Sequence, residues 1–241
     1  MKCMEYVGNE LSTFIEARNF HLYYMCLFGQ CLQGQVLEVG AGLGTFTEEI
    51  LKSGAAGLTA CEPDRKMAES LAKTMAGKAQ VVSGGIRDVP AENGPFDAIV
   101  YVDVMEHIED DRAEMIAAAG RLKPGGALVI GGPAHSWLYS PFDAAIGHYR
   151  RYDRRSIERL VDRCDGLDLE RFQYFDCLGM ILSLGNKWLS RQTLPTGRQI
   201  KFWNDVILPL SRRIDPLLNY RVGKSFVAVA RRKRRSLREV A

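Results

Sequence analysis

The chain has 241 residues, which is enough for one medium domain or for one domain with an appendage. Hydrophobic residues make up 46% and charged residues 25%, a composition that excludes disordered and collagen-like chains. The net charge is +3, but the tail 231–241 alone carries +5, so the rest of the chain carries −2. This nearly neutral body argues against a dedicated nucleic-acid-binding protein.

Apolar periodicity predicts alternating helices and strands over the first half of the chain. A helical segment at 9–33 comes first. We expect strands at Val36–Val39, Gly57–Cys61, Gln80–Ser83, Phe96–Val102 and Ala127–Gly131, helices at Thr45–Ser53, Arg65–Met75 and Asp111–Arg121, and a turn at Leu122–Gly126. Such alternation predicts a parallel sheet with helices wrapped around it.

The second half begins with a polar, aromatic loop at 134–155. We expect a helix at Ser156–Cys164, strands at Asp168–Phe175 and Ser225–Ala230, and helices at Leu178–Leu189 and Phe202–Ile214. The last two strands could form a hairpin, although a long insert separates them. An insert of that length in a compact domain usually has a functional or assembly role.

The six cysteines form no C-x-x-C pair, which argues against a zinc site and a disulfide framework. We expect most of them to be small buried side chains in a reducing compartment. The N-terminus does not resemble a secretory signal, and the apolar stretches are too short to cross a bilayer. These features predict a cytoplasmic protein. Oligomeric state does not follow from the sequence, and a monomer and a homodimer are both compatible with it.

The stretch VLEVGAGLGTFT (36–47) is the most informative part of the chain. A short strand is followed by Gly40, Gly42 and Gly44, and then by a helix start. Glycines at such a turn let the backbone approach a nucleotide-like ligand closely. The dinucleotide fingerprint G-x-G-x-x-G is not met, and Glu38 suits a cationic ligand. The combination suggests S-adenosyl-L-methionine (SAM).

Acidic and imidazole side chains follow two further strands. Glu62 closes the second strand in T-A-C-E-P-D, where an acid can accept hydrogen bonds from ribose hydroxyls. Asp103, Glu106 and His107 follow the strand at 96–102, in the crevice where α/β folds place ligands. These positions support an adenosine-containing ligand.

Four segments between about 36 and 131 resemble class I SAM-dependent methyltransferases: VLEVGAGLGTFT, the acid in ACEPD, FDAIVYVDVMEHI and LKPGGALVI. A narrower resemblance is to a bacterial group of small-molecule methyltransferases (methyltransferase type 11/12-like). It is carried by GHYRRY (147–152), by GKSFVAVAR (223–231) and by an N-terminal pattern of Glu10, Leu11, Asn19 and Tyr23. The resemblance implies an α/β, Rossmann-like, seven-stranded, mostly parallel sheet with helices on both faces, an N-terminal helix and a helical insert before the last strand.

The resemblance also implies one domain, 1–241. It would comprise a helical cap (1–33), a SAM-binding core (34–131), a substrate loop with the helical insert (132–222), the last strand (223–231) and a basic tail (232–241). Its cofactor-binding residues would be Glu38, Gly40, Ala41, Gly42, Glu62, Pro63, Gly85, Ile86, Arg87, Asp103 and Val104.

Within this site, Glu38 would lie near the methionyl amine, Glu62 would bind the ribose and Asp103 would lie beside the methionyl part. Gly85 departs from the pattern, because many relatives have an aspartate there that accepts a hydrogen bond from the adenine amino group. Either affinity is lower, or Asp88 or a water substitutes.

Methyl transfer to a hydroxyl requires alignment and a base. His107, His135 and His148 follow the fourth and fifth core strands or lie in the adjoining loop, and each is a candidate base with a structural role as the alternative. His21 could line the cofactor mouth. Asp103, Glu106 and His107 have a D-x-x-E-H spacing similar to that of metal-associated ubiquinone-biosynthesis methyltransferases. Metal-independent relatives also have a Glu-His pair at this place, so we expect no metal here. Glu106 would instead cap or pair at the next helix.

Tyr149, Arg150, Arg151 and Tyr152 of GHYRRY are candidate substrate-binding residues, because arginine binds carboxylate or phosphate bidentately. In an extended segment, Arg150 and Tyr152 share one face, and Tyr149 and Arg151 the other. The alternative is an arginine–aspartate network that holds the loop through Asp143 or Asp153.

We therefore expect methyl transfer from SAM to an oxygen, less readily a nitrogen or carbon, of a small or lipid-linked, anionic acceptor. Nucleic acid is not expected as a substrate, since the N/D-P-P-Y/F motif is missing. The apolar insert and the basic tail permit peripheral membrane contact. The rivals are a non-catalytic SAM-binding protein and an NAD(P)-dependent oxidoreductase.

Overall fold

The computed structural model describes residues 17–189 and 196–234. In this part of the chain one sheet has the strand order β3-β2-β1-β4-β5-β7-β6. The strands are β1 (Gln35–Val39), β2 (Gly57–Glu62), β3 (Gln80–Ser83), β4 (Phe96–Val102), β5 (Leu122–Pro133), β6 (Leu167–Phe175) and β7 (Ser225–Arg232). β7 is antiparallel to β5 and β6, and the other neighbours pair in parallel. The expected seven-stranded, mostly parallel sheet is confirmed.

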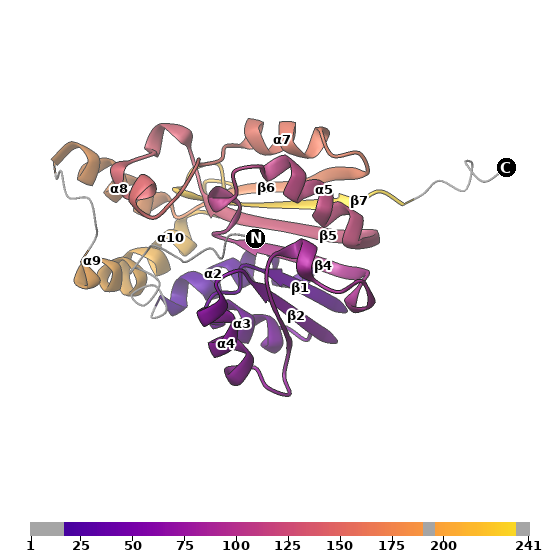
Figure 1. Cartoon of the computed structure of the whole chain (residues 1–241). Helices are drawn as coiled ribbons and strands as arrows, with labels where there is room; N and C mark the ends of the chain where they lie inside the picture. Colours follow the sequence, from indigo (N-terminus) through magenta and orange to yellow (C-terminus); the bar gives the residue numbers. More distant parts are fainter. Residues whose placement is uncertain (1–16, 190–195, 235–241) are drawn as a thin grey trace.

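Helices cover both faces of this sheet (Figure 1). They are α2 (Arg18–Phe28), α3 (Thr45–Lys52), α4 (Arg65–Thr74), α5 (Asp111–Arg121), α6 (Pro141–Ala145), α7 (Arg154–Asp162), α8 (Cys177–Leu189), α9 (Gly197–Phe202) and α10 (Leu208–Ile214). Helices α5 and α7 pack on one face, whereas α2, α3 and the α9–α10 segment pack on the other. The result is a three-layer α/β sandwich of the kind that a Rossmann-like fold requires.

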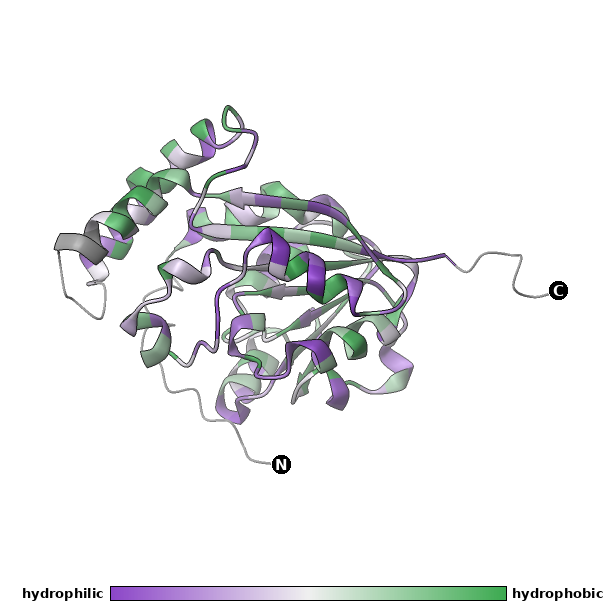
Figure 2. Cartoon of the chain, turned by 90° about the horizontal axis from the view of Figure 1, so that it is seen from above, coloured by the Kyte–Doolittle hydropathy of each residue, from purple (hydrophilic) through white to green (hydrophobic). Residues whose placement is uncertain are grey.

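The central strands are buried because both of their faces are covered. In β1 the last four residues are buried, and in β4 the run Ala98–Tyr101 is fully buried. Figure 2 shows the strands as mostly apolar, with hydrophilic residues concentrated on helices and loops. The near-continuous runs of valine, leucine and isoleucine in the sequence therefore mark the middle of the sheet.

The expected limits of two elements, the turn at Leu122–Gly126 and the helix at Phe202–Ile214, are wrong. The segment Leu122–Gly126 is not a separate turn but the first part of β5, with Leu122 paired to Phe96 and Ala127 to Ala98. The residues in between form an irregularity in the ladder, where Gly125 has a positive φ of 83°. The helix expected at Phe202–Ile214 begins earlier, at Gly197, because Thr196 and Gln199 form a capping box.

The other expected limits differ less from the structure. Helix α7 begins at Arg154 instead of Ser156, since Asp153 caps it. The expected N-terminal helix is described as α2 followed by a 3₁₀ turn at Gly29–Cys31, and its residues 9–16 lie outside the described part of the chain. The hairpin of the last two strands is confirmed by the antiparallel pairing of β6 with β7. Among the described cysteines, Cys26 is exposed and the others are buried.

The helical insert between β6 and β7 is described over residues 177–189 and 196–222, and these parts lie at one end of the sheet (Figure 1). Because β6 ends where the insert begins and β7 starts where it ends, the insert adjoins the edge at which the parallel strand β5 also ends. A short π-helical turn, Trp203–Ile207, joins α9 to α10. In the described part of the chain, no helix combines the length and the apolar character needed to cross a membrane.

Candidate active site

The strand order reverses direction between β1 and β4, which neighbour each other at the centre of the sheet. In open α/β sheets, ligands bind in the crevice beyond the carboxyl ends of strands at such a switch point. Glu38 lies near the end of β1, Glu62 ends β2 and Asp103 follows β4, so the three expected acids meet at this edge. The predicted clustering is therefore present in the fold.

The glycine loop after β1 is shaped by close contacts. Gly40, Gly42 and Gly44 all have positive φ angles, of 74°, 55° and 89°. A Cβ on Gly40 would lie 2.5 Å from the side chain of Val104, so glycine is required where the loop passes the end of β4. A Cβ on Gly42 would instead meet nothing within 4 Å. The loop thus packs against β4 at Gly40 and faces open space at Gly42.

Glu62 holds this loop from the neighbouring strand. Its Oε2 accepts a hydrogen bond of 2.8 Å from the Gly42 amide, and its Oε1 accepts one of 2.8 Å from the Asp64 amide. Burial raises the pKa of Glu62, although these two amide bonds oppose the rise. Each carboxylate oxygen retains a further lone pair, which suits the expected role of binding ribose hydroxyls.

Glu38 is the most heavily buried of the three acids. It is 4% exposed, and its Oε2 accepts a 2.6 Å hydrogen bond from the hydroxyl of Thr47. Desolvation raises the pKa of Glu38 to about 8. None of the ion pairs between described residues involves Glu38. A buried acid without a cation beside an open glycine loop fits a ligand that brings its own positive charge.

Asp103 has a strained backbone, with a φ of 53°, directly after β4. Its Oδ1 accepts a 3.2 Å hydrogen bond from the hydroxyl of Tyr24 on α2. Burial raises the pKa of Asp103 to about 6, and the nearby His148 and the Tyr24 hydrogen bond limit the rise. The helix α2 thus contributes a side chain directly to the site.

The segment after β3 forms a single turn, Ile86–Asp88. Ile86 is buried and Arg87 is exposed. Gly85 has an ordinary φ of −93°, and a Cβ there would meet nothing within 4 Å. Asp88 is the suggested substitute acceptor for the adenine amino group. Its Oδ2 already accepts a 2.9 Å hydrogen bond from the Gly85 amide. This part of the site is therefore open enough for a larger residue than glycine.

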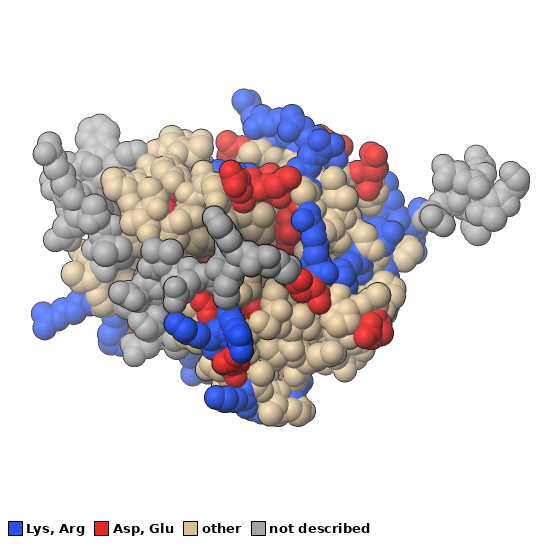
Figure 3. All heavy atoms as spheres, viewed as in Figure 1, with Lys and Arg blue, Asp and Glu red and all other residues tan. Residues whose placement is uncertain are grey.

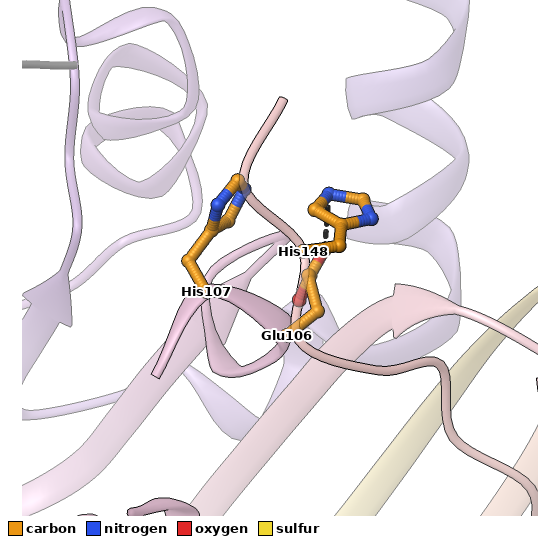
Figure 4. A group of neighbouring side chains, drawn as sticks. All are labelled: Glu106, His107 and His148. Carbon is orange, nitrogen blue, oxygen red and sulfur yellow. Dashed lines mark ion pairs between the residues drawn. The ribbon is translucent and has the colours of Figure 1, made fainter. Parts of the chain in front are cut away.

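A second cluster of polar side chains lies just past Asp103, where the loop after α6 returns to the sheet (Figure 4). His148 Nδ1 lies 2.9 Å from Asp143 Oδ1. Hydrogen bonds from His148, Arg151 and Ser140 lower the pKa of Asp143, which keeps it ionised despite its burial. An ionised carboxylate can only accept, so Nδ1–H of His148 donates and the lone pair of the neutral ring is on Nε2.

Glu106 faces this lone pair. It is 1% exposed, and its Oε1 lies 3.8 Å from His148 Nε2. Both of its oxygens lack a hydrogen-bond partner among the described residues. Desolvation and the neighbouring Asp103 raise the pKa of Glu106 well above its ordinary value. The expectation that Glu106 caps the next helix is wrong, because Asp110 caps α5 through the Ala113 amide.

His107 completes this group, with its ring 4.6 Å from that of His148 and at 82° to it. Burial lowers the pKa of His107 to about 4, so its ring is neutral at physiological pH. Donor atoms of Glu106, His107 and His148 all lie within 4.8 Å of one another. The structure therefore groups His148, rather than Asp103, with Glu106 and His107, which differs from the D-x-x-E-H set considered from spacing.

His135, the remaining candidate base, has a different environment. Its Nε2 lies 3.0 Å from the carbonyl oxygen of Gly223 and must donate to it. The ring is stacked on Tyr174, with centroids 4.6 Å apart and an interplanar angle of 22°. Burial lowers the pKa of His135. These contacts match the structural alternative more closely than a catalytic role.

The GHYRRY segment has the alternation expected of an extended strand. Arg150 and Tyr152 both reach Asp111, at 2.6 Å and 3.0 Å, while Arg151 turns the other way and binds Asp143 with two hydrogen bonds of 2.8 Å and 3.0 Å. Tyr152 is buried. The arginine–aspartate network is thus present, and through Asp143 as expected.

Tyr149, at 54% exposure, is the most accessible of the four candidate substrate-binding side chains. Its amide donates a 2.8 Å hydrogen bond to the Glu106 carbonyl, which holds the Tyr149 backbone beside the histidine cluster. Arg150 keeps 30% of its side chain exposed. Of these four side chains, Tyr149 is therefore the most accessible to a substrate.

Two site residues were not anticipated, since Tyr24 and Thr47 reach Asp103 and Glu38 from helices. Asp143 was expected only as a partner of the arginines, and it also orients His148. For Asp143 a local signal existed, because Ser140 and Asp143 form a capping box at the start of α6. No sequence signal pairs Tyr24 with Asp103, since 79 positions separate them.

Comparison with known proteins finds similarity to methyltransferases. Residues 36–126 match the model of a family described as a methyltransferase domain. The chain is 28% identical over 156 residues to demethylmenaquinone methyltransferase of Tropheryma whipplei (strain Twist), with 64% of this chain and 62% of that protein covered. It is 32% identical over 103 residues to ubiquinone biosynthesis O-methyltransferase of Vibrio parahaemolyticus, with 42% of each covered. These matches span at most about three fifths of the curated relatives.

Solved structures extend the likeness to nearly the whole fold. A SAM-dependent methyltransferase from Archaeoglobus fulgidus has a TM-score of 0.56 at 16% identity, with 93% of this chain and 95% of that one covered. At this identity the likeness concerns the fold. Residues 36–126 thus match a methyltransferase-domain family, and the chain around them has the Rossmann-like fold of class I SAM-dependent methyltransferases.

Proposed function

We propose that this protein is a SAM-dependent methyltransferase that acts on an oxygen of a small or lipid-linked acceptor. The observation that carries the proposal is the set of three acids at the switch point, Glu38, Glu62 and Asp103, whose pKa values are all raised. Burial disfavours the ionised form of each acid, and a cation bound beside them would favour it again. SAM carries positive charge on both its sulfonium and its ammonium group, and it therefore complements this edge.

The same acids argue against the rival cofactor. NAD(P) places an anionic pyrophosphate at the glycine loop, where it needs hydrogen-bond donors and a favourable potential. In its ionised form the buried Glu38 would repel it, and the loop lacks the third glycine of the dinucleotide fingerprint. The electrostatics support SAM over NAD(P).

The chemistry that SAM supplies when bound is an electrophilic methyl group, which leaves sulfur as the carbon–sulfur bond breaks and the electron pair stays on sulfur. The residues of this chain then have to align the acceptor and take up a proton from its hydroxyl. In our proposal His148 accepts that proton at Nε2, because Asp143 fixes the tautomer and stabilises the imidazolium through Nδ1–H.

For the acceptor, the names of the relatives point to the biosynthesis of quinones, which are apolar ring molecules whose reduced forms carry ring hydroxyls. We infer an acceptor of similar character, a hydroxylated small molecule with an apolar or lipid part. Tyr149 would contact it at the rim of the histidine cluster, and Arg150 would favour an anionic group nearby. Arg151 and Tyr152 would serve chiefly to hold the loop.

Calorimetric titration with SAM, S-adenosylhomocysteine and NADH tests the cofactor. We expect micromolar binding of the first two, loss of binding in Glu62→Ala and no binding of NADH. Labelled SAM is then offered with a bacterial lipid extract and a phenol library. Label transfer that His148→Gln abolishes supports the enzyme, whereas tight SAM binding without transfer to either pool favours the non-catalytic rival. NADH binding without SAM binding would refute the proposal.

A further inference from the structure

Exposed apolar side chains are concentrated on the helical insert (residues 177–222). Of the eleven large apolar side chains that are exposed in the described part of the chain, seven belong to it. They are Ile181, Leu182, Phe202, Val206, Leu210, Leu217 and Leu218, with Leu217 80% exposed. Figure 2 shows the helices of the insert as largely apolar. Monomeric soluble proteins rarely gather apolar side chains in one region without a function for them.

The segment from α9 to α10 has two distinct faces. Ile200, Trp203 and Leu208 are buried against the sheet and α2. Phe202, Val206 and Leu210 follow one another at intervals of four residues and are 53%, 44% and 42% exposed. Residues four apart lie along one side of a helix. These three side chains therefore form an exposed apolar ridge along this segment.

Basic side chains border the ridge. The described part of the insert from 196 to 221 contains Arg198, Lys201, Arg212, Arg213 and Arg221, all exposed, against one exposed acid, Asp205, which pairs with Lys201 at 2.6 Å. In Figure 3 basic side chains border the lower left of the molecule, where α9 lies in Figure 1. An apolar ridge with a basic border complements an anionic surface that has an apolar interior.

A buried polar network fixes the orientation of the insert. Asp215 accepts hydrogen bonds from the Tyr23 hydroxyl at 2.7 Å and from the Asp176 amide at 2.7 Å. Asp176 in turn accepts from the indole of Trp203 at 2.7 Å. These contacts tie α10, α9 and the start of α8 to the N-terminal helix α2. Because Tyr24 of the same helix reaches Asp103, the ridge is held in a defined position relative to the active site.

We propose that the helical insert docks on the surface of an anionic phospholipid bilayer, with the Phe202–Val206–Leu210 ridge inserted among the headgroups. The basic border binds the lipid phosphates. Since the insert adjoins the sheet edge that holds Glu38, Glu62 and Asp103, docking brings the mouth of the active site to the membrane. That last step rests on the proposed function and gives a lipid-borne acceptor a short route to the site.

Flotation of the full-length protein with vesicles tests the docking directly. Vesicles of phosphatidylcholine alone are compared with vesicles containing phosphatidylglycerol, at low and high salt. We expect flotation with the anionic vesicles only, and less of it at high salt, because screening weakens contacts with headgroups. Equal flotation with both lipids, or none with either, would overturn the proposal.

Matched variants separate the two parts of the surface. Phe202→Ser/Leu210→Ser should reduce the floated fraction about tenfold, because apolar area inserted in the bilayer drives binding. Arg212→Gln/Arg213→Gln should remove the preference for anionic lipid. Ile116→Ser on α5, which is 51% exposed and lies outside the insert, is the control and should float like the wild type. Loss of flotation in all three variants alike would contradict the assignment.

Sedimentation velocity without lipid distinguishes the main competing occupant. If the ridge were a contact between two copies of the chain, the wild type would be a dimer that Phe202→Ser/Leu210→Ser dissociates, and that outcome overturns membrane docking. SAM titration of the wild-type protein is independent of lipid. In the wild type, retained SAM binding with no flotation therefore refutes docking alone, whereas flotation without SAM binding refutes the proposed function alone.

Discussion

Asp143 and His148 form a buried pair in which the Nδ1–H of the imidazole donates to the carboxylate at 2.9 Å. His148 is 8% exposed and Asp143 is fully buried. Because Arg151 and Ser140 hold the carboxylate from its other sides, the imidazole has one orientation and one tautomer. The arrangement presents Nε2 to the space that Glu106 and His107 also face, and it underlies the first prediction.

His148→Gln should lower kcat by about 10²–10⁴-fold with little change in SAM affinity, because it removes the proton acceptor and leaves the cofactor site intact. Asp143→Asn should lower kcat less and shift the acidic limb of the pH–rate profile to lower pH, since a neutral amide no longer stabilises the imidazolium. Steady-state rates from pH 5 to 9 measure both effects. His135→Gln is the control and should keep the wild-type profile; if it alone loses the acidic limb, His135 is the base.

The affinity for SAM should rise with pH and level off above about pH 8. In the free protein the pKa of Glu38 is raised to about 8, so the group is mostly protonated below that pH. A bound cation favours the carboxylate, so binding releases a proton and is weaker where that proton must be removed. We expect about a tenfold gain in affinity between pH 6 and pH 8.5, measured by calorimetry. In Glu38→Gln the dependence should vanish; its persistence would mean that another acid is responsible.

The raised pKa of Glu38 also affects stability. A carboxyl whose pKa is higher in the folded than in the unfolded state loses stability as pH rises from its ordinary value through the folded one. Without ligand, the wild type should therefore lose stability relative to Glu38→Gln between pH 4.5 and 8. Saturating SAM should reduce this difference. Thermal melting of both proteins at a series of pH values tests the expectation, and parallel melting curves would contradict it.

Gly85→Asp should strengthen SAM binding by about three- to tenfold, the effect of one added hydrogen bond to the adenine amino group. The position has an ordinary φ and open space for a side chain. Gly84→Asp is a matched control one residue away, with a φ of 141° and Asp88 2.5 Å from its ideal Cβ. We expect that variant to lose stability and affinity. If Gly85→Asp binds SAM no better than the wild type, the adenine lies elsewhere.

Asp215→Ala should destabilise the protein by about 3–5 kcal/mol, because it leaves the Tyr23 hydroxyl and the Asp176 and Cys177 amides without their acceptor in the core. Asp215→Asn should cost less, since its amide oxygen still accepts. Asp205→Ala removes an exposed pair from the same insert and should leave the melting temperature nearly unchanged. Urea unfolding of the three variants ranks them, and equal losses for Asp215 and Asp205 would show that the buried network is not what holds the insert.

Methyl transfer should continue after dialysis against EDTA, because in our proposal Nε2 of His148 takes up the proton. The donor atoms of Glu106, His107 and His148 nevertheless lie within 4.8 Å of one another, as metal ligands do. If EDTA abolished the activity and Mg²⁺ or Zn²⁺ restored it, the mechanism would use a metal centre in place of the histidine base. A Glu106→Gln variant distinguishes these mechanisms, since loss of a ligand raises the metal concentration needed for half-maximal activity.

The sequence by itself determined the features that local chemistry controls. Apolar runs bounded by charges predict Gln80–Ser83, Phe96–Val102 and Asp111–Arg121 at their observed limits. The glycine spacing and the acids Glu38 and Glu62 predict the position of the nucleotide-like ligand, because a tight strand–loop–helix turn has few alternatives to glycine. Where two local patterns compete, as in LKPGG, the strand ladder prevailed over the turn that proline and glycine favour.

Only the tertiary structure decided which distant residues meet. The packing of helices and loops at the end of the sheet brings Tyr24 to Asp103, pairs Asp215 with the start of α8 and places Glu106 opposite His148. In the same packing, His135 is hydrogen-bonded to the Gly223 carbonyl and Arg151 to Asp143. Candidate residues with similar chemistry therefore have different roles. Burial then shifts the pKa values of these groups according to their surroundings. Such contacts depend on the packing of whole layers, and no local pattern of residues encodes them.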